Sequence, residues 1–197
     1  MNLTAIEGED EIARLHFLDS LALLPLVVPQ NASVIDIGTG AGFPGLVLKI
    51  ARPSLRLTLL DSQGKRIAFL QDVCRSLGFD DVTFVNARAE EAITENRESF
   101  DYAVSRAVAR LNVLCELCLP YVRQSGAFIA MKGPAHEEEM KEAEGAAARL
   151  GATAEEDRLY TIPGTEIRHS AILFRKKTPS DTAYPRRWSQ IVKKPLC

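Results

Sequence analysis

Short apolar runs alternate with longer amphipathic segments along most of this chain. Short runs rich in β-branched or aromatic side chains predict buried strands, and apolar side chains spaced three or four residues apart predict helices. We expect strands at 34–37, 57–60, 82–85, 102–104, 127–131, 153–161 and 167–176, and helices at 10–24, 45–51, 65–77, 111–119 and 135–150.

The order of these elements indicates the fold class. Strands that alternate with helices favour a mostly parallel, doubly wound α/β sheet with its ligand over the carboxyl ends of the strands. Pro163 and Gly164 separate the last two strands, and this turn chemistry favours an antiparallel hairpin. We therefore expect a seven-stranded, mostly parallel sheet that ends in an antiparallel pair.

The helix expected at 10–24 places three polar residues on one side. His16, Asp19 and Ser20 are spaced by three and four residues, so they share a stripe along the helix. A hydrolase triad is one interpretation, but triad residues normally converge from separate elements, and the sequence holds no Gly-x-Ser-x-Gly elbow. A packing or capping role and a place in the wall of a pocket both stay open.

A glycine-rich turn follows the first strand and precedes the next helix. Gly38, Gly40, Gly42 and Gly45 lie close together, which permits positive φ angles and close approach of a ligand to the backbone. A helix that begins next to Pro44 turns its free N–H groups toward such a ligand. The pattern predicts a nucleotide-type site, although glycine-rich turns that bind nothing have the same pattern.

Two acidic residues narrow the choice of ligand. Asp36 stands inside the first strand, two residues before Gly38, where nicotinamide-binding strands are usually apolar. Its carboxylate could face the ammonium group that S-adenosylmethionine carries and NAD lacks. Asp61, with Ser62, ends the second strand, where an acidic residue holds the ribose diol in both kinds of nucleotide fold. The exit of the third strand, residues 86–90, is expected beside the adenine.

Composition sets limits on the architecture and the partners. With 197 residues, of which 46% are apolar and 25% charged, the chain can bury one substantial core. The apolar stretch at 21–28 is too short for a membrane span and lacks signal-peptide flanks, so we expect a cytoplasmic protein. The four cysteines lack zinc-site spacing, and we expect no metal. Because the formal charge is −2, any nucleic-acid contact needs a local basic patch.

The C-terminal end of the chain carries such a patch. From Arg175 onward there are seven lysines or arginines and a single acid, Asp181. Tyr184 and Trp188 lie among these cations. The patch has two interpretations, a solubilising tail or a surface that contacts phosphates and stacks on bases.

Several of these features together resemble one protein family. They are the run at 2–6, the segments at 16–21 and 36–45, Leu60-Asp61-Ser62 with Lys65-Arg66, Ser105-Arg106-Ala107, Lys132-Gly133, and the closing segments at 184–187 and 193–196. In content and order they resemble the RsmG (GidB) family of bacterial methyltransferases. The resemblance implies a Rossmann-like class I methyltransferase fold and S-adenosylmethionine as the cofactor. It also implies methylation of a guanine at N7, nucleotide 527, in 16S rRNA of the small ribosomal subunit.

The resemblance further implies roles for individual residues. Gly38 and Phe43 would contact S-adenosylmethionine from the loop, Ala89 and Glu90 would flank its adenosine, and Arg106 would lie at the methyl-transfer end as the catalytic residue. With the residues discussed above, the expected cofactor contacts are Asp36, Gly38, Gly40, Gly42, Phe43, Asp61, Ser62, Ala89, Glu90 and Arg106. The expected RNA contacts are His16, Arg88, Lys132, Arg186, Arg187, Lys193 and Lys194.

We expect three parts along the chain. Residues 1–30 would form a helical cap, shortened because family members usually carry further helical sequence before the run at 2–6. Residues 31–177 would form the S-adenosylmethionine-binding domain, and residues 178–197 a basic tail. We expect the protein to act as a monomer.

The strand exits also bear on the chemistry. The exit of the fourth strand carries neither the [Asp/Asn]-Pro-Pro-[Tyr/Phe] string of amine methyltransferases nor the cysteine of cytosine-C5 methyltransferases. Guanine N7 has an exposed lone pair and no proton to lose, so its methylation needs alignment more than a base. Arg106 could hold guanine O6, a phosphate or the cofactor carboxylate. The alternatives are a methyltransferase with another substrate, a nicotinamide-dependent oxidoreductase and a non-catalytic RNA-binding module.

Overall fold

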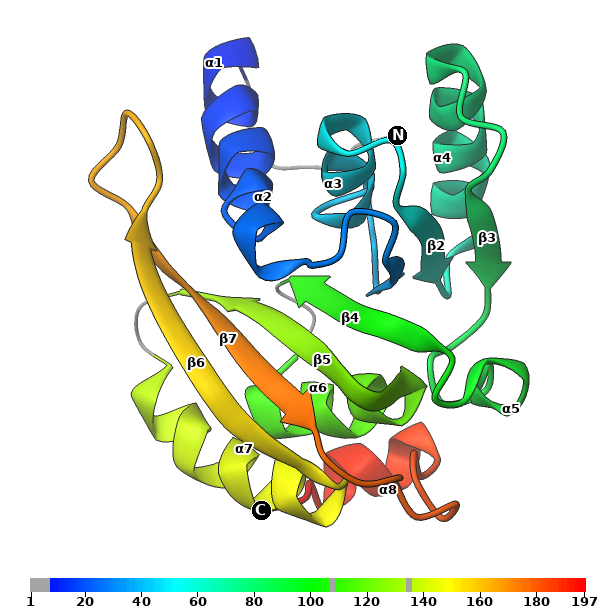
Figure 1. Ribbon diagram of the computed structural model, residues 1–197, viewed down its shortest axis with the longest axis vertical. Helices are drawn as coiled ribbons and strands as arrows, with labels where there is room; N and C mark the ends of the chain where they lie inside the picture. The colour runs from blue at the N-terminus through cyan, green and yellow to red at the C-terminus, as the bar shows by residue number, and fades with distance from the viewer. Residues whose placement is uncertain (1–7, 107–108, 134–135) are drawn as a thin grey trace.

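The computed structural model describes residues 8–106, 109–133 and 136–197. Seven strands in these ranges form one sheet in the order β3-β2-β1-β4-β5-β7-β6. The strands are β1 (Ser33–Ile37), β2 (Arg56–Asp61), β3 (Thr83–Asn86), β4 (Phe100–Arg106), β5 (Val122–Lys132), β6 (Ala152–Thr161) and β7 (Arg168–Lys176). The first five run parallel, and β7 pairs antiparallel with both β5 and β6 (Figure 1). The expected fold class is confirmed.

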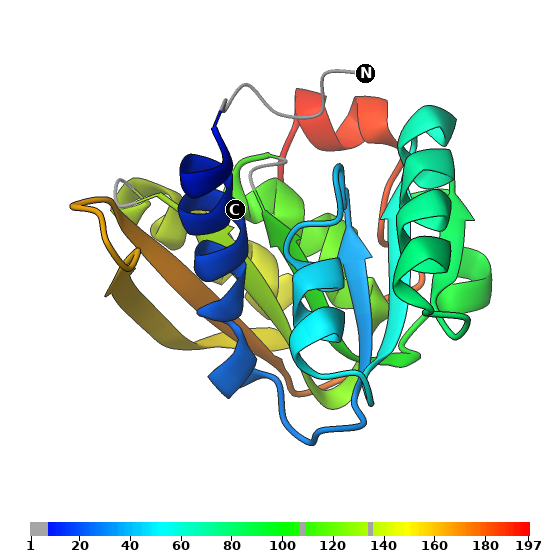
Figure 2. The same cartoon turned by 90° about the horizontal axis from the view of Figure 1, so that it is seen from above.

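Helices cover both faces of this sheet. The helical elements are α1 (Glu9–Ile12), a π-helical stretch η1 (Ala13–Leu18), α2 (Asp19–Leu21), η2 (Leu24–Leu26), α3 (Gly45–Ala51), α4 (Gly64–Leu77), α5 (Ile93–Asn96), α6 (Leu111–Cys118), η3 (Leu119–Tyr121), α7 (Glu137–Arg149) and α8 (Trp188–Lys193). The helices α3 and α4 lie on one face together with residues 9–21, which we call the N-terminal helical segment. The helices α6, α7 and α8 lie on the other face (Figures 1 and 2).

Alternate residues of the central strands enter two apolar clusters, one on each face. Val34 and Leu57 pack in a cluster with side chains of α3 and α4. Ile35 and Ile37 pack in a second cluster with side chains of α6 and α7. Because the sheet is buried on both faces, its central strands are apolar without the polar alternation of a half-exposed strand.

The strand order reverses at β1, which pairs with β2 on one side and with β4 on the other. A reversal of this kind opens a crevice at the carboxyl ends of the strands, because the connections on either side diverge. The glycine-rich turn leaves β1 at this point. The fold therefore places the turn where the sequence predicted a ligand.

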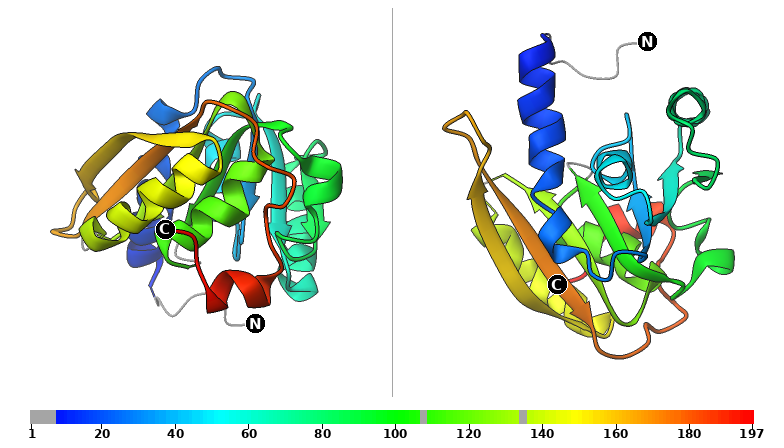
Figure 3. Two further views of the ribbon diagram at one scale, coloured as in Figure 1. Left: turned by 90° about the horizontal axis from the view of Figure 1, so that it is seen from below. Right: turned by 45° about the horizontal axis from the view of Figure 1, so that its top comes forward.

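The N-terminal helical segment stands beside the C-terminal hairpin. It spans residues 9–21, close to the expected helix at 10–24, and lies between the β6–β7 hairpin and α3 (Figures 1 and 3). The run at 2–6 and Ala107 lie outside the described residues. Within the described ranges, no helix has both the length and the apolar character needed to cross a membrane.

The C-terminal segment, residues 178–197, packs onto the sheet domain. Ile191 is fully buried and Leu196 nearly so, both in the cluster that contains α6 and α7. The Asn112 amide donates to the Leu196 carbonyl at 2.9 Å. A Cβ added to Gly145 of α7 would overlap the main chain of Cys197. The segment expected as a tail thus shares the core of the domain.

Candidate active site

The turn between β1 and α3 is held through its own backbone. Gly38, Gly40 and Gly42 adopt φ angles of 72°, 59° and 98°, a region that residues with a Cβ rarely occupy. The Gly38 N–H donates to the Leu60 carbonyl at 2.9 Å, and the Gly40 N–H donates to the Asp61 carboxylate at 3.0 Å. These bonds attach the turn to the carboxyl end of β2.

Asp36 lies beneath this turn and is fully buried. Its Oδ2 accepts hydrogen bonds from the Thr39 hydroxyl at 2.7 Å and from the Gly45 N–H at 2.8 Å. Its Oδ1 has no hydrogen-bond partner among the described residues. Burial raises the pKa of Asp36 to about 6, although the bonds from Thr39 and Gly45 act to lower it. One carboxylate oxygen is therefore held by the turn, and the other could accept from a bound group.

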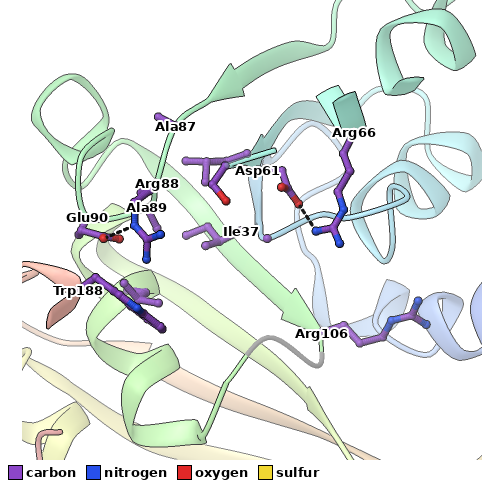
Figure 4. Close-up of a pocket in the computed structure, with 13 residues that line it drawn as sticks. Ile37, Asp61, Arg66, Ala87, Arg88, Ala89, Glu90, Arg106 and Trp188 are labelled. Carbon is purple, nitrogen blue, oxygen red and sulfur yellow. Dashed lines mark hydrogen bonds and ion pairs between the residues drawn. The ribbon is translucent and has the colours of Figure 1, made fainter. Parts of the chain in front are cut away.

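A first cavity, of about 410 Å³, opens beside the turn over the carboxyl ends of β1, β2 and β3. Its lining residues are Ile37, Gly38, Leu60, Asp61, Ser62, Arg66, Ala87, Arg88, Ala89, Glu90, Arg106, Leu117 and Trp188 (Figure 4). Six of the expected cofactor contacts are among them, namely Gly38, Asp61, Ser62, Ala89, Glu90 and Arg106. The other four, Asp36, Gly40, Gly42 and Phe43, lie outside this lining.

Seven lining residues of the first cavity were not among the expected cofactor contacts, and three of them, Arg66, Arg88 and Trp188, carry charged or aromatic side chains. Arg66 of α4 pairs with Asp61 at 3.2 Å. Arg88, which we expected on the RNA, pairs with Glu90 at 2.7 Å, and its guanidinium lies 5.1 Å from the centre of the Trp188 ring. Lys65-Arg66 was visible in the sequence as a basic pair after Asp61. Trp188 was not placed here, because no local pattern links α8 to the exit of β3.

A second cavity, of about 550 Å³, lies between the N-terminal helical segment, the end of β5 and the start of β7. Its lining residues are Leu15, His16, Asp19, Arg106, Met131, Lys132, Gly133, Ile167 and His169. Of these, Arg106 also lines the first cavity. Two of the expected RNA contacts, His16 and Lys132, are brought together here. Of the two roles left open for the stripe, the structure shows that His16 and Asp19 line a cavity.

A network of hydrogen bonds fixes Arg106 in the wall of the second cavity. One guanidinium nitrogen donates to the Asp19 carboxylate and to the Leu15 carbonyl, each at 3.2 Å. The other lies 3.0 Å from Nδ1 of His16. The guanidinium also lies 5.0 Å from the centre of the Phe43 ring, a distance at which cations are attracted to aromatic faces. Figure 4 shows Arg106 extending away from Asp61 and Glu90.

Asp19 is itself held by the C-terminal hairpin. Its buried carboxylate accepts from the Tyr160 hydroxyl of β6 at 2.7 Å and from Nδ1 of His169 on β7 at 2.9 Å. Burial acts to raise the pKa of Asp19, but the bonds from His169 and Tyr160 and the charge of Arg106 outweigh it and lower the pKa. Asp19 is therefore an anion that joins three separate parts of the chain.

His16 contacts both Arg106 and Phe43 in this network. Its ring stacks on Phe43 with the centroids 4.8 Å apart. Because a guanidinium can only donate, Nδ1 of His16 accepts the bond from Arg106. Burial and the neighbouring Arg106 charge lower the pKa of His16, although Asp19 acts to raise it. The imidazole is therefore neutral at pH 7.

The four expected RNA contacts of the C-terminal segment fall into two groups. The guanidinium of Arg186 makes two bonds to the buried Glu116 carboxylate, at 2.8 and 2.6 Å. This pairing anchors the segment to α6. Arg187, Lys193 and Lys194 are exposed to solvent. Of the four expected RNA contacts in the segment, these three present their charge to solvent.

A sequence model of the family described as rRNA small subunit methyltransferase G (GidB) matches residues 1–161. The chain belongs to this family. It is 47% identical over 199 residues to Ribosomal RNA small subunit methyltransferase G of Alkaliphilus metalliredigens (strain QYMF). The alignment covers 100% of this chain and 83% of that protein. The protein of the same name from Lactobacillus helveticus (strain DPC 4571) is 41% identical over 203 residues, with 100% and 84% covered.

Solved structures of other proteins share the fold at low sequence identity. M. jannaschii TYW2, whose structure was solved in complex with AdoMet, superimposes with a TM-score of 0.65 at 11% identity, covering 81% of this chain and 76% of that one. The predicted family, fold, enzyme class and S-adenosylmethionine cofactor are confirmed. Membership of a methyltransferase family excludes two of the alternative hypotheses, a nicotinamide-dependent oxidoreductase and a non-catalytic RNA-binding module. Among the described residues, no cluster of three or more histidine, cysteine or acidic side chains could hold a metal.

Proposed function

We propose that this protein transfers the methyl group of S-adenosylmethionine to N7 of a guanine in 16S rRNA, at nucleotide 527. Family membership gives the methyltransferase class and the rRNA of the small subunit, and the atom and the nucleotide are the proposal. The observation that carries it is the wall between the two cavities. The side chain common to both walls is Arg106, and a guanidinium is not a base.

Three observations support a cofactor site formed by the glycine-rich turn together with the first cavity beside it. The unpartnered Oδ1 of Asp36 is an acceptor suited to the ammonium group. A Cβ added to Gly40 would meet nothing closer than 4.0 Å, so the space beside this residue admits a ligand close to the backbone. Asp61 lies in the lining and would hold the ribose, with Glu90 and the Trp188 ring beside the adenosine. When bound, the cofactor supplies a methyl group on a positively charged sulfur.

The hydrogen bonds around Arg106 also occupy the basic atoms of His16 and Asp19. Nδ1 of His16 accepts from Arg106, and both oxygens of Asp19 accept from other groups. His169 donates to Asp19 through Nδ1, so Nε2 of its neutral ring is an acceptor. Guanine N7 loses no proton when it is methylated. An N7 acceptor therefore needs no contribution from His169 as a base.

The RNA would approach from the side of the exposed cations. Arg187, Lys193 and Lys194 are available for phosphates, and Arg186 would contribute by fixing the segment that carries them. Lys132, paired with Glu139 at 2.8 Å, lies in the second cavity. We expect the protein to act as a monomer in the cytoplasm, where small ribosomal subunits are assembled.

A single-turnover experiment with saturating S-adenosylmethionine tests the proposal. We expect the rate of methyl transfer to change less than about threefold between pH 6 and 8.5, for the wild type and for His169→Gln, which retains a donor to Asp19. The product should carry N7-methylguanosine, whose glycosidic bond becomes open to borohydride and aniline cleavage at one guanine. A rate that falls tenfold per pH unit in the wild type but not in His169→Gln would reveal a base. Methylated RNA that resists cleavage would place the methyl group on another atom.

A further inference from the structure

The second cavity is outside the cofactor site but shares a wall with it. Its volume of about 550 Å³ falls in the range of small-molecule pockets. Because Arg106 lines both cavities, a group in the second cavity and a group in the first would meet at this residue. Two reactants placed in adjoining pockets gain the proximity that a transfer reaction needs.

The polar groups of the second cavity match one edge of a guanine. Among the described residues, Asp19, Leu15 and His16 use three of the five N–H donors that a guanidinium carries. Lys132 adds a second cation to the wall. Guanine presents the acceptors O6 and N7 on its Hoogsteen edge, whereas adenine presents an N6 amino donor in place of O6. Hydrogen-bond donors in the cavity wall therefore favour guanine, which offers O6 as an acceptor, over adenine, whose N6 amino group is itself a donor.

Asp19 controls where these donors point. Its carboxylate holds one guanidinium nitrogen of Arg106 and is itself held by Tyr160 and His169. The side chain is buried, so its charge acts on these partners with little screening by water. Without this carboxylate the Arg106 guanidinium would lose its only acidic partner among the described residues.

We infer that the second cavity receives the acceptor guanine, that Arg106 binds its O6 and leaves N7 free, and that Asp19 is the positioning residue that aims Arg106. This inference rests on the proposed function. It assigns the base selectivity of the enzyme to Arg106 and Asp19, and it assigns no base selectivity to the exposed cations of the C-terminal segment.

Two base analogues test the assignment directly. In the small-subunit RNA that the wild type methylates, the target guanine is replaced by inosine, which keeps O6 and N7, or by 2-aminopurine, which keeps N7 and lacks O6. We expect the wild type to prefer inosine by about tenfold or more in kcat/KM. In Asp19→Asn and in Arg106→Lys the preference should shrink to within about threefold, while in Asp19→Asn, whose side chain does not line the first cavity, the Kd of S-adenosylmethionine stays within about threefold of the wild type. The double variant should be no less selective than either single variant, because both act on one contact.

A cavity-blocking variant gives a second measurement that does not depend on Asp19. Ile167 lines the cavity and is 43% exposed, whereas Leu159 on β6 is 46% exposed and is not part of the lining. We expect Ile167→Trp to lower kcat/KM for the RNA at least tenfold with S-adenosylmethionine binding unchanged, and the matched Leu159→Trp to retain the wild-type rate.

The outcomes separate the two proposals. Full activity of Ile167→Trp, or an inosine preference that persists in Asp19→Asn, would overturn the inference while the proposed function stands. A wild type that methylates RNA at an atom other than N7 would overturn the proposed function, whatever the variants do.

Discussion

The first and second cavities share Arg106 but are built in different ways. The first is shaped by backbone and by side chains that follow the ends of three neighbouring strands, at Gly38, Asp61 and 87–90. The second is shaped by ionisable side chains that reach one another from the N-terminal helical segment, β4 and the β6–β7 hairpin. One cavity depends on local geometry, and the other depends on bonds between distant parts of the chain.

This difference predicts how each cavity responds to substitution. In the first, the positive φ angles of the turn tolerate few side chains, so changes at its glycines should act on folding and cofactor binding together. In the second, conservative changes of one charged group should leave the fold in place but disturb every partner of that group. The predictions below test the backbone-built cavity, from the largest effect to the smallest.

Gly42→Val should have the largest effect. Gly42 has φ 98°, and a Cβ there would lie 2.9 Å from Leu70 and 3.1 Å from Leu46. We expect a loss of about 3 kcal/mol or more in the free energy of unfolding, from backbone strain and overpacking together, and no measurable S-adenosylmethionine binding. Denaturant unfolding and calorimetry measure both. Gly78→Val is the matched control, because Gly78 has φ 73° but no atom within 4 Å of an added Cβ. Equal losses in the free energy of unfolding for Gly42→Val and Gly78→Val would show that the close contacts of the added side chain at Gly42 contribute nothing to the effect.

Asp61→Ala should have a smaller effect that is concentrated on the cofactor. The Asp61 carboxylate accepts from the Gly40 N–H and from Arg66, and it would also bind the ribose. We expect the affinity for S-adenosylmethionine to fall about ten- to a hundredfold, since charge-assisted hydrogen bonds contribute about 1.5 to 3 kcal/mol. Asp72→Ala on α4 removes an exposed pair with Arg75 and should leave the affinity unchanged. An unchanged affinity for S-adenosylmethionine in Asp61→Ala would show that the ribose does not bind to the Asp61 carboxylate.

The sequence predicted the first cavity better than the second for a physical reason. Asp61 is the last residue of β2, and Gly38, Ala89 and Glu90 follow the ends of β1 and β3. Parallel strands bring their carboxyl ends to one edge whatever their exact pairing. Strand ends can be located from apolar runs alone. The fold and the part of the first cavity that lies at the strand ends were therefore predictable from local patterns, and the family resemblance added the choice of cofactor.

The second cavity depends on register and packing, which local patterns do not contain. The stripe of His16 and Asp19 was visible, but its partners Tyr160 and His169 face it only because of the pairing between β6 and β7. A shift of one residue in that pairing would place Tyr160 and His169 on opposite faces of the sheet. The packing of the C-terminal segment onto the domain was not predicted, for a related reason. Its charges dominate the sequence, whereas Ile191 and Leu196, which bury it, are isolated apolar residues.

The smallest predicted effect is a pH dependence that links Asp36 to the cofactor. Burial raises the pKa of Asp36 to about 6, above the ordinary value near 4. Its stabilising contribution to the fold is thus present below about pH 4 and is lost as the pH rises through 6, because the buried carboxylate then ionises. An ammonium group facing Oδ1 would favour that ionised form, so binding should release a proton at acidic pH.

We therefore expect the affinity for S-adenosylmethionine to fall about tenfold from pH 7 to pH 5, a range in which the amino group of the ligand is charged. Calorimetry at pH 5.5 in two buffers of different ionisation enthalpy should detect the release of up to about 0.8 proton per ligand, because a carboxyl with a pKa of about 6 is only partly protonated at that pH. Asp36→Asn, which keeps the shape but cannot ionise, should bind more weakly at pH 7 and with no such release. Because Asp36→Asn leaves His16 and the other ionisable groups in place, the difference between wild type and Asp36→Asn is the decisive quantity. Equal proton release in both would place the ammonium group away from Oδ1 and leave Asp36 as a support for the turn alone.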